Sequence, residues 1–170
     1  MSDLPTYVLE RTLAAPRELV WKTWIDPELV ARWYGPNVET VVHRLDLKPG
    51  GLWLVEMRRD GRSSYQRVEY VEVTAPERLI WLHSNADADW NIVSSQMMQD
   101  WPRILLTTVT LEQAGDQTKL RLTWVPHEAS AAEIACFRAA IGGMDRGWAA
   151  GMELLKKLLA ELQAQPVPSR

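Results

Sequence analysis

The pattern of apolar and polar positions changes its period along the chain. Residues 7 to 13 alternate between the two kinds, which predicts a strand with one mostly apolar face. The alternation returns in six segments between residues 38 and 126, separated by turn sequences such as Asp60-Gly61. Because short connections favour antiparallel pairing, the sequence predicts an antiparallel sheet of about seven strands.

Two short helices are expected between the first and second strands. In PRELVWKTWID, residues 16 to 26, apolar residues recur at steps of three and four, and the proline suits a first helical turn. Asp26 precedes a proline, which ends this helix, and it can cap the next one, PELVARWY. The Gly35-Pro36 pair then stops the second helix.

The period becomes helical from residue 128 onward. A stripe at steps of three and four predicts a C-terminal helix of about 30 residues that ends before Pro166. The stripe consists of Phe137, Ile141, Met144, Trp148, Met152, Leu155, Leu158, Leu159 and Leu162. The length suits one core, so we expect a single domain over residues 1–170, with a folded core of about 6–163 and a disordered tail at 164–170.

Glycines interrupt this last helix. Gly143, Gly147 and Gly151 are spaced by four, and Gly142 precedes them. Each glycine inside a helix costs about 1 kcal/mol relative to alanine, so a compensating role is expected. Two roles stay open: close packing or a kink at Gly142-Gly143, and empty volume beside the helix for a ligand.

Large side chains recur on the expected inward faces of the strands. Alternation places Trp53, Val55 and Met57 on one such face, Trp81 and His83 on a second, and Trp124 on a third. Together with the glycine-rich helix, these faces would either enclose an elongated apolar cavity or fill a packed core. The connection at residues 84–102 is too long for a turn, and its Met97 and Trp101 are too apolar for a solvated linker. We therefore expect it to form a flap over an opening.

Composition narrows the class of protein. Nineteen Lys and Arg against 22 Asp and Glu give a formal charge of -3 without charged blocks, so nucleic acid is not an expected partner. Charges interrupt every apolar run, and the N-terminus lacks a secretory pattern, so no membrane association is expected either. The single Cys136 fits a reducing compartment, which favours a cytoplasmic location. Nine Trp and four Tyr against one Phe suit polar anchors in a cavity or ordinary half-buried positions.

Catalytic patterns are weak. The three histidines lack metal-ligand spacing, and Cys136 has no CxxC partner, so neither a metal nor a cofactor is expected. No residue is assigned a catalytic role. Glu69 or His83 could act as a general acid or base if its strand turned it inward.

Several sequence segments resemble those of the START-like (SRPBCC, Bet v 1-like) superfamily, in the branch named after the activator of the heat-shock-protein-90 ATPase. They are APRELVWKTWIDPELVARWYGP, LDLKPGGLW, VEVTAPERLIW, TTVTLEQAGDQTKLRLTW and MDRGWAAGMELLKKL, in that order along nearly the whole chain. The resemblance implies an α+β helix-grip fold, in which a curved antiparallel sheet wraps around a long C-terminal helix and encloses an apolar cavity. The order predicted from periodicity, a strand, two short helices, six strands and a long helix, agrees with that fold.

Three functions follow as hypotheses, because membership of a fold does not decide function. The first is non-catalytic binding of a small hydrophobic or aromatic molecule. Its expected site is Trp33, Trp53, Val55, Met57, Trp81, His83, Met97, Trp101, Trp124, Phe137, Ile141, Met144 and Trp148. Trp24 and Trp33 are expected mainly to hold the two short helices against one end of the sheet, and Trp33 or Tyr34 could also line the cavity mouth.

The second hypothesis is a cyclase-like or hydrolase-like enzyme acting on a polyketide-like substrate. It requires that at least one of His43, His83, Glu69 and Asp100 lies in the cavity. The third is a chaperone accessory protein. It is the least favoured, because 170 residues leave no space for the separate chaperone-binding domain that a full co-chaperone would carry. A homodimer, through a sheet edge or the flap, stays open.

Overall fold

Seven strands and three helices make up the computed structural model, which describes residues 4–95 and 97–164. The elements are β1 (Tyr7–Leu13), α1 (Arg17–Ile25), α2 (Pro27–Trp33), β2 (Glu39–Leu45), β3 (Leu52–Arg59), β4 (Arg62–Thr74), β5 (Arg78–Ala86), β6 (Leu105–Ala114), β7 (Gln117–Pro126) and α3 (Ala131–Ala164). The strands form one antiparallel sheet in the order β1-β7-β6-β5-β4-β3-β2. The predicted element order and sheet are confirmed.

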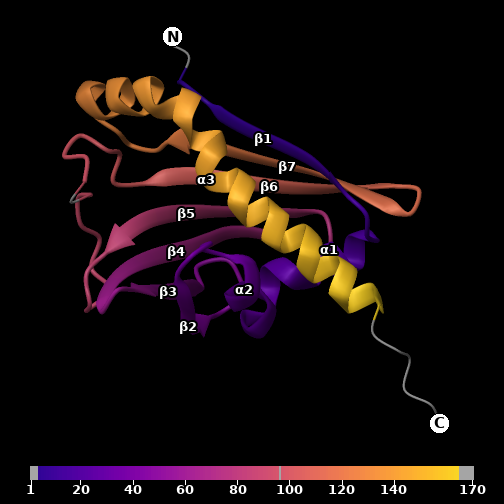
Figure 1. Cartoon of the computed structure of the whole chain (residues 1–170). Helices are drawn as coiled ribbons and strands as arrows, with labels where there is room; N and C mark the ends of the chain where they lie inside the picture. Colours follow the sequence, from indigo (N-terminus) through magenta and orange to yellow (C-terminus); the bar gives the residue numbers. More distant parts are fainter. Residues whose placement is uncertain (1–3, 96, 165–170) are drawn as a thin grey trace.

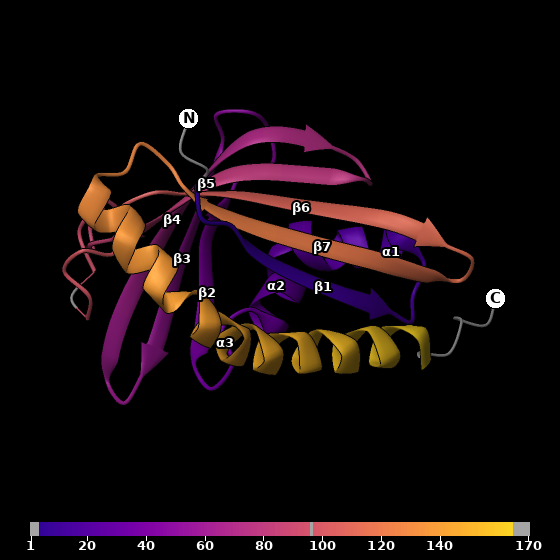
Figure 2. The same ribbon diagram turned by 90° about the horizontal axis from the view of Figure 1, so that it is seen from above.

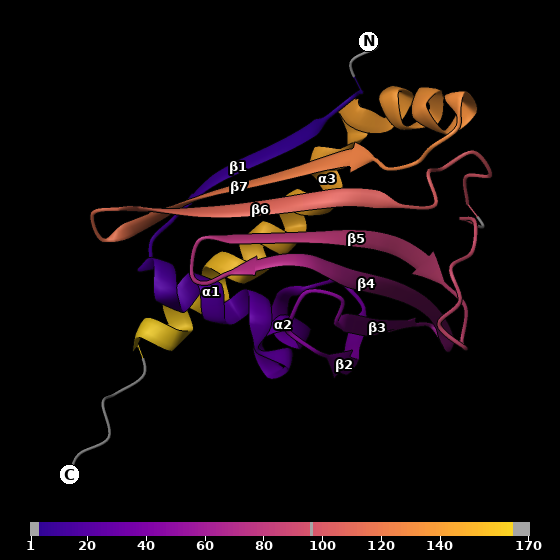
Figure 3. The same cartoon turned by 180° about the vertical axis from the view of Figure 1, so that it is seen from behind.

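All three helices lie over the same face of the curved sheet. α3 crosses that face diagonally in Figure 1, with α1 and α2 beside its second half, and the strands stand in front of α3 when the molecule is seen from behind in Figure 3. Trp24 of α1 lies against Trp81 of β5, with ring centroids 6.0 Å apart. This arrangement is the helix-grip fold, and it leaves the opposite face of the sheet without a covering helix.

The local signals read from the sequence act as expected. Asp60 and Gly61 both have positive φ, 51° and 75°, which is the geometry of a type I′ turn between β3 and β4. Asp26 Oδ1 accepts the backbone N-H of Glu28 at 3.0 Å and caps α2. The turn connects two neighbouring strands, and the cap fixes the start of α2 directly after α1.

α3 is longer than expected and changes direction. Ser130 Oγ accepts the N-H of Glu133 at 3.1 Å, and a Glu133 carboxylate oxygen accepts the N-H of Ser130 at 3.0 Å, which forms a capping box. The helix continues to Ala164, so residue 164 is helical and not part of a tail, and residues 165–170 lie outside the described residues. Figures 1 and 2 show a bend in the orange first half of α3, which is one of the roles considered for Gly142-Gly143.

The apolar stripe of α3 is not uniformly buried. Phe137 and Met152 are fully buried, whereas Met144 and Trp148 between them are only partly buried. The sequence pattern is the same throughout, so the difference comes from what lies opposite the helix. The middle of α3 stands away from the sheet, and the candidate site lies there.

Candidate ligand pocket

A pocket of about 320 Å³ lies under the middle of α3 and is partly open to solvent. The segment after α2 and strands β3, β4, β5 and β7 contribute its other walls. Its lining residues are Trp33, Tyr34, Gly35, Pro36, Met57, Gln66, His83, Trp124, Gly143, Met144, Gly147, Trp148 and Gly151. The volume is at the lower end of the range of about 300–1,000 Å³ that is typical of ligand pockets, so it suits a compact molecule.

The glycines of α3 form one wall of this pocket. A Cβ placed on Gly143 or Gly147 would have no neighbouring atom within 4 Å, and one on Gly151 would meet only the Trp33 carbonyl oxygen at 4.0 Å. Close packing therefore does not require glycine at 143 or 147. What glycine provides at these positions is open volume next to the pocket.

Three indoles form the aromatic walls. Trp33 ends α2, and its Nε1 donates to the backbone oxygen of Thr23 at 2.8 Å, which fixes the ring. Trp148 meets Trp124 at a centroid distance of 5.4 Å and an interplanar angle of 66°. It also meets Tyr34 at 6.4 Å and 74°. Trp148 thus connects the β7 side of the pocket to the α2 side.

A tight turn after α2 sets the rim. Gly35 has φ 84°, and a Cβ there would lie 2.8 Å from Thr40 Oγ1 and 3.0 Å from Met57 Cε. The Thr40 hydroxyl donates to the backbone oxygen of Tyr34 at 2.5 Å. Only glycine satisfies both the left-handed backbone and the space, so Gly35 allows the chain to turn between Tyr34 and β2.

The polar part of the lining consists of three side chains, Tyr34 directly after α2, Gln66 of β4 and His83 of β5. His83 Nε2 lies 3.0 Å from Gln66 Oε1, and the Tyr34 hydroxyl lies 3.5 Å from the same oxygen. Burial lowers the pKa of His83 to about 4 and raises the pKa of Tyr34 above its usual value, so both groups are uncharged near neutral pH. The His83 ring also lies nearly parallel to Trp124, with an interplanar angle of 11° and centroids 6.0 Å apart.

Part of the expected site set lines the pocket. The residues that do so are Trp33, Met57, His83, Trp124, Met144 and Trp148. Trp53, Val55 and Trp81 face inward as expected but are buried in the core away from the pocket. The reason is that α1 and α2 cover this part of the sheet, where Trp81 packs between Trp24, at 6.0 Å, and Trp53, at 5.8 Å.

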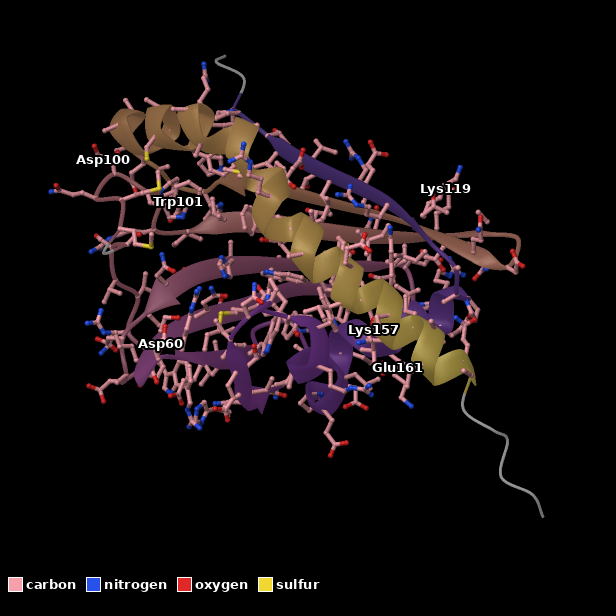
Figure 4. The ribbon with its side chains drawn as sticks, in the orientation of Figure 1. Asp60, Asp100, Trp101, Lys119, Lys157 and Glu161 are labelled. Atoms are coloured by element: carbon pink, nitrogen blue, oxygen red, sulfur yellow. The ribbon has the colours of Figure 1, made fainter. Side chains whose placement is uncertain are left out.

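The rest of the expected set lies elsewhere. Phe137 and Trp101 pack on one another, with centroids 5.6 Å apart, near the first turns of α3, where Figure 4 labels Trp101. Ile141 packs against the core and does not line the pocket. The side chain of Met97 is 95% exposed, contrary to the expectation that it faces a ligand.

The long connection does not cover this pocket. β5 extends to Ala86, and none of the described residues between 87 and 104 contributes to the lining. Trp90 packs instead on His43 and Tyr65, at centroid distances of 5.4 and 5.3 Å, and its carbonyl oxygen accepts from Arg67 at 3.2 Å. Tyr65 and Arg67 alternate with Gln66, so they lie on the opposite face of the sheet. The prediction that the segment at residues 84–102 forms a flap over the opening is therefore wrong for this pocket.

Gln66 and the Gly35-Pro36 turn were absent from the expected set. The sequence does contain a signal for Gln66. It alternates in step with Val68 and Tyr70, which are both buried on the inward face of β4, so its side chain lies on the same face. A polar residue among apolar residues on the inward face of a strand indicates a polar contact in the interior of the protein. The sequence offers no comparable signal that the turn forms a rim, because that depends on how α2 is placed over the sheet.

Among the acid and base candidates, His83 alone lines the pocket. His43 contacts Glu56 at 2.8 Å, and Glu69 lies 3.9 Å from Arg67, both on the opposite face of the sheet. Asp100 is exposed. Hydrogen bonds from Arg58, Ser63 and His43 lower the pKa of Glu56 to about 2.

No group of three or more metal-binding side chains occurs within residues 4–95 and 97–164. Over the same residues, no helix is long and apolar enough to span a membrane.

A family model described as Activator of Hsp90 ATPase homolog 1-like protein matches residues 14–160. The chain belongs to this family. The match spans both short helices, most of α3 and every lining residue of the pocket.

Solved structures share the fold at low sequence identity. A solution structure of a protein from Arthrobacter aurescens has a TM-score of 0.77 and 22% identity, with 92% of this chain and 86% of that chain covered. The crystal structure of protein Ms6760 from Mycobacterium smegmatis has a TM-score of 0.74 and 22% identity, with 98% and 99% covered. A Rhodobacter sphaeroides protein has a TM-score of 0.74 and 18% identity, with 92% and 93% covered. A search of curated proteins found no significant match.

Proposed function

We propose that the protein binds a small, largely apolar molecule in the pocket under α3, without chemical conversion. The observation that carries the proposal is the combination of three indoles with three glycines around about 320 Å³. Apolar surface that stays wet in the free protein favours a ligand that replaces the water, because removal of apolar area from water is the main driving force of such binding.

The glycines support this proposal through their cost. Gly142, Gly143 and Gly147 each weaken the helix by about 1 kcal/mol relative to alanine, and alanine would meet no atom at any of the three positions. Stability alone would therefore favour alanine. A requirement for open volume accounts for Gly143 and Gly147, which line the pocket.

The experiment is titration with the neutral fluorescent probe N-phenylnaphthylamine. We expect saturable binding to the wild-type protein and a loss of affinity of at least about tenfold in Gly147→Leu, whose side chain would occupy the pocket. Gly142→Leu is the matched control, since it lies in the same helix without lining the pocket, and it should bind within about twofold of wild type. Absence of probe binding, or equal affinities in both variants, would remove the proposal.

A hydrolase-like or cyclase-like enzyme is the second candidate, and His83 is the observation that favours it. It is a titratable side chain in the pocket, and its lowered pKa leaves it unprotonated and able to accept a proton near pH 7. Release of p-nitrophenol from neutral nitrophenyl esters, compared between wild type and His83→Gln, tests the hydrolase form. Rates equal to buffer alone in both proteins would exclude it for these esters.

The family description suggests a third candidate, stimulation of the Hsp90 ATPase. ATP hydrolysis by purified Hsp90, with and without a molar excess of this chain, tests it directly. An unchanged rate would leave the pocket as the basis of function.

A further inference from the structure

Gln66 is the polar group of the pocket whose hydrogen-bond direction can be assigned. Its side-chain oxygen lies within reach of His83 Nε2, at 3.0 Å, and of the Tyr34 hydroxyl, at 3.5 Å. An amide oxygen only accepts hydrogen bonds, so the proton of His83 resides on Nε2 and the Tyr34 hydroxyl points toward Gln66. The Nε2-H group of His83 and the hydroxyl group of Tyr34 are therefore both directed at the side-chain oxygen of Gln66.

This arrangement leaves the amide N-H groups of Gln66 unused. Within the described part of the chain, Gln66 Nε2 donates to no side chain or backbone oxygen. Gln66 lines the pocket, so the amide group borders its interior. An amide donor in a mostly apolar pocket loses free energy on ligand binding unless the ligand supplies an acceptor.

The remaining lining carries no formal charge. No Asp, Glu, Lys or Arg is among the described residues that form it, and His83 and Tyr34 are neutral near pH 7. A charged group on the ligand would therefore be desolvated without a partner. The indoles of Trp33, Trp124 and Trp148 offer ring faces and edges, which pack best against flat rings.

We propose that the pocket selects neutral, planar aromatic molecules that carry a carbonyl group, and that Gln66 is the specificity-determining residue because its amide donates to that carbonyl. The proposal rests on the proposed binding function and adds the chemical class of the ligand. Gln66 acts on the ligand directly, whereas His83 and Tyr34 orient its amide.

The test uses three molecules with the same ring skeleton, each measured by displacement of N-phenylnaphthylamine. Fluorenone carries a carbonyl, fluorene carries a methylene group in its place, and fluorene carboxylate carries a negative charge on the same carbon. We expect wild type to bind fluorenone about fivefold to tenfold more tightly than fluorene, the effect of one net hydrogen bond. The carboxylate should bind more weakly than either neutral compound.

Two variants assign the preference to the amide. Gln66→Leu removes the donor and the acceptor, and Gln66→Glu keeps an acceptor for His83 and Tyr34 but removes the N-H donors. In both variants the preference for fluorenone should be lost, so that fluorenone binds about as tightly as fluorene or more weakly. Gln117→Leu, which replaces an exposed glutamine outside the pocket, should retain it. Circular dichroism of each variant verifies the fold, and Gln66→Glu keeps the test valid if Gln66→Leu does not fold.

The outcomes separate this proposal from the general one. Fluorene binding that is sensitive to Gly147→Leu but lacks a preference for fluorenone would overturn the role of Gln66 and leave binding intact. A preference that persists in Gln66→Glu would overturn it as well. Tight binding of the carboxylate would overturn the requirement for neutrality. Absence of any probe binding would overturn both proposals.

Discussion

The indole of Trp24 meets that of Trp33 edge to face, with ring centroids 4.7 Å apart and an interplanar angle of 66°. Both rings are almost completely buried, yet only Trp33 has a hydrogen-bond partner for its N-H, the backbone oxygen of Thr23. Trp24 Nε1 has none among the described residues. The pair joins α1 to α2 and holds the α2 wall of the pocket in place.

This asymmetry predicts different costs for the same substitution. Trp33→Phe should lower the free energy of unfolding by about 1–2 kcal/mol more than Trp24→Phe, because it leaves the Thr23 carbonyl without its donor. Urea denaturation of the two variants measures the difference. Equal losses would show that the Trp33 hydrogen bond contributes little.

A second prediction concerns the rim turn. Gly35→Ala and Gly115→Ala both place a side chain at positive φ, which costs about 1–2 kcal/mol. Only Gly35 has close neighbours for the new methyl group, with Thr40 Oγ1 at 2.8 Å, whereas Gly115 has none within 4 Å. Gly35→Ala should therefore be less stable than Gly115→Ala by a further 1–3 kcal/mol, approximately the cost of overpacking. Thermal or urea unfolding provides the comparison, and similar stabilities would mean that the rim relaxes freely.

His83 predicts a pH dependence of stability. Burial lowers its pKa from an ordinary 6.5 to about 4, so between these values the unfolded chain binds the proton more readily than the folded one. The contribution is complete above about pH 6.5 and is lost as pH falls toward 4. His83→Gln should flatten this part of the profile of unfolding free energy against pH. A wild-type profile identical in shape to that of the variant would contradict the assignment.

Glu56 predicts a second, more acidic dependence on the opposite face of the sheet. Arg58, Ser63 and His43 hold its pKa near 2 instead of 4.5, so its stabilising effect is present above about pH 4.5 and declines as pH falls toward 2. Glu56→Gln should be less stable than wild type at neutral pH, and the two should converge in acid. Urea midpoints at several pH values test this, with Glu112→Gln, an exposed carboxylate change, as the control.

The sheet and the helices could be predicted because the signals for them are local. Strand alternation, the Asp60-Gly61 turn and the Asp26 cap each depend on neighbouring residues, and each appears in the structure as expected. The curvature of the sheet around the last helix could be predicted only from the sequence segments that resemble the family.

The pocket was only partly predictable because it depends on which helix lies above each strand. Trp81 and His83 share one face of β5, yet Trp81 is covered by α1 while His83 borders the pocket. The alternation of residues along a strand predicts which face of the sheet a side chain lies on, but not which helix covers that face. The prediction that Met97 faces a ligand is wrong for a related reason. Apolar character favours burial but does not show which residues a side chain packs against, and the side chain of Met97 lies in solvent.

The arrangement of the pocket walls has a consequence for how the specificity of the protein can change. One wall is a helix surface at Gly143, Gly147 and Gly151, and the other walls belong to the sheet and the rim turn. Substitutions at Gly143 and Gly147 change the depth of the pocket, and the first carbon atom added at either position meets no neighbouring atom within 4 Å. Ligand size can therefore diverge between homologous chains, or be redesigned, while the sheet stays unchanged.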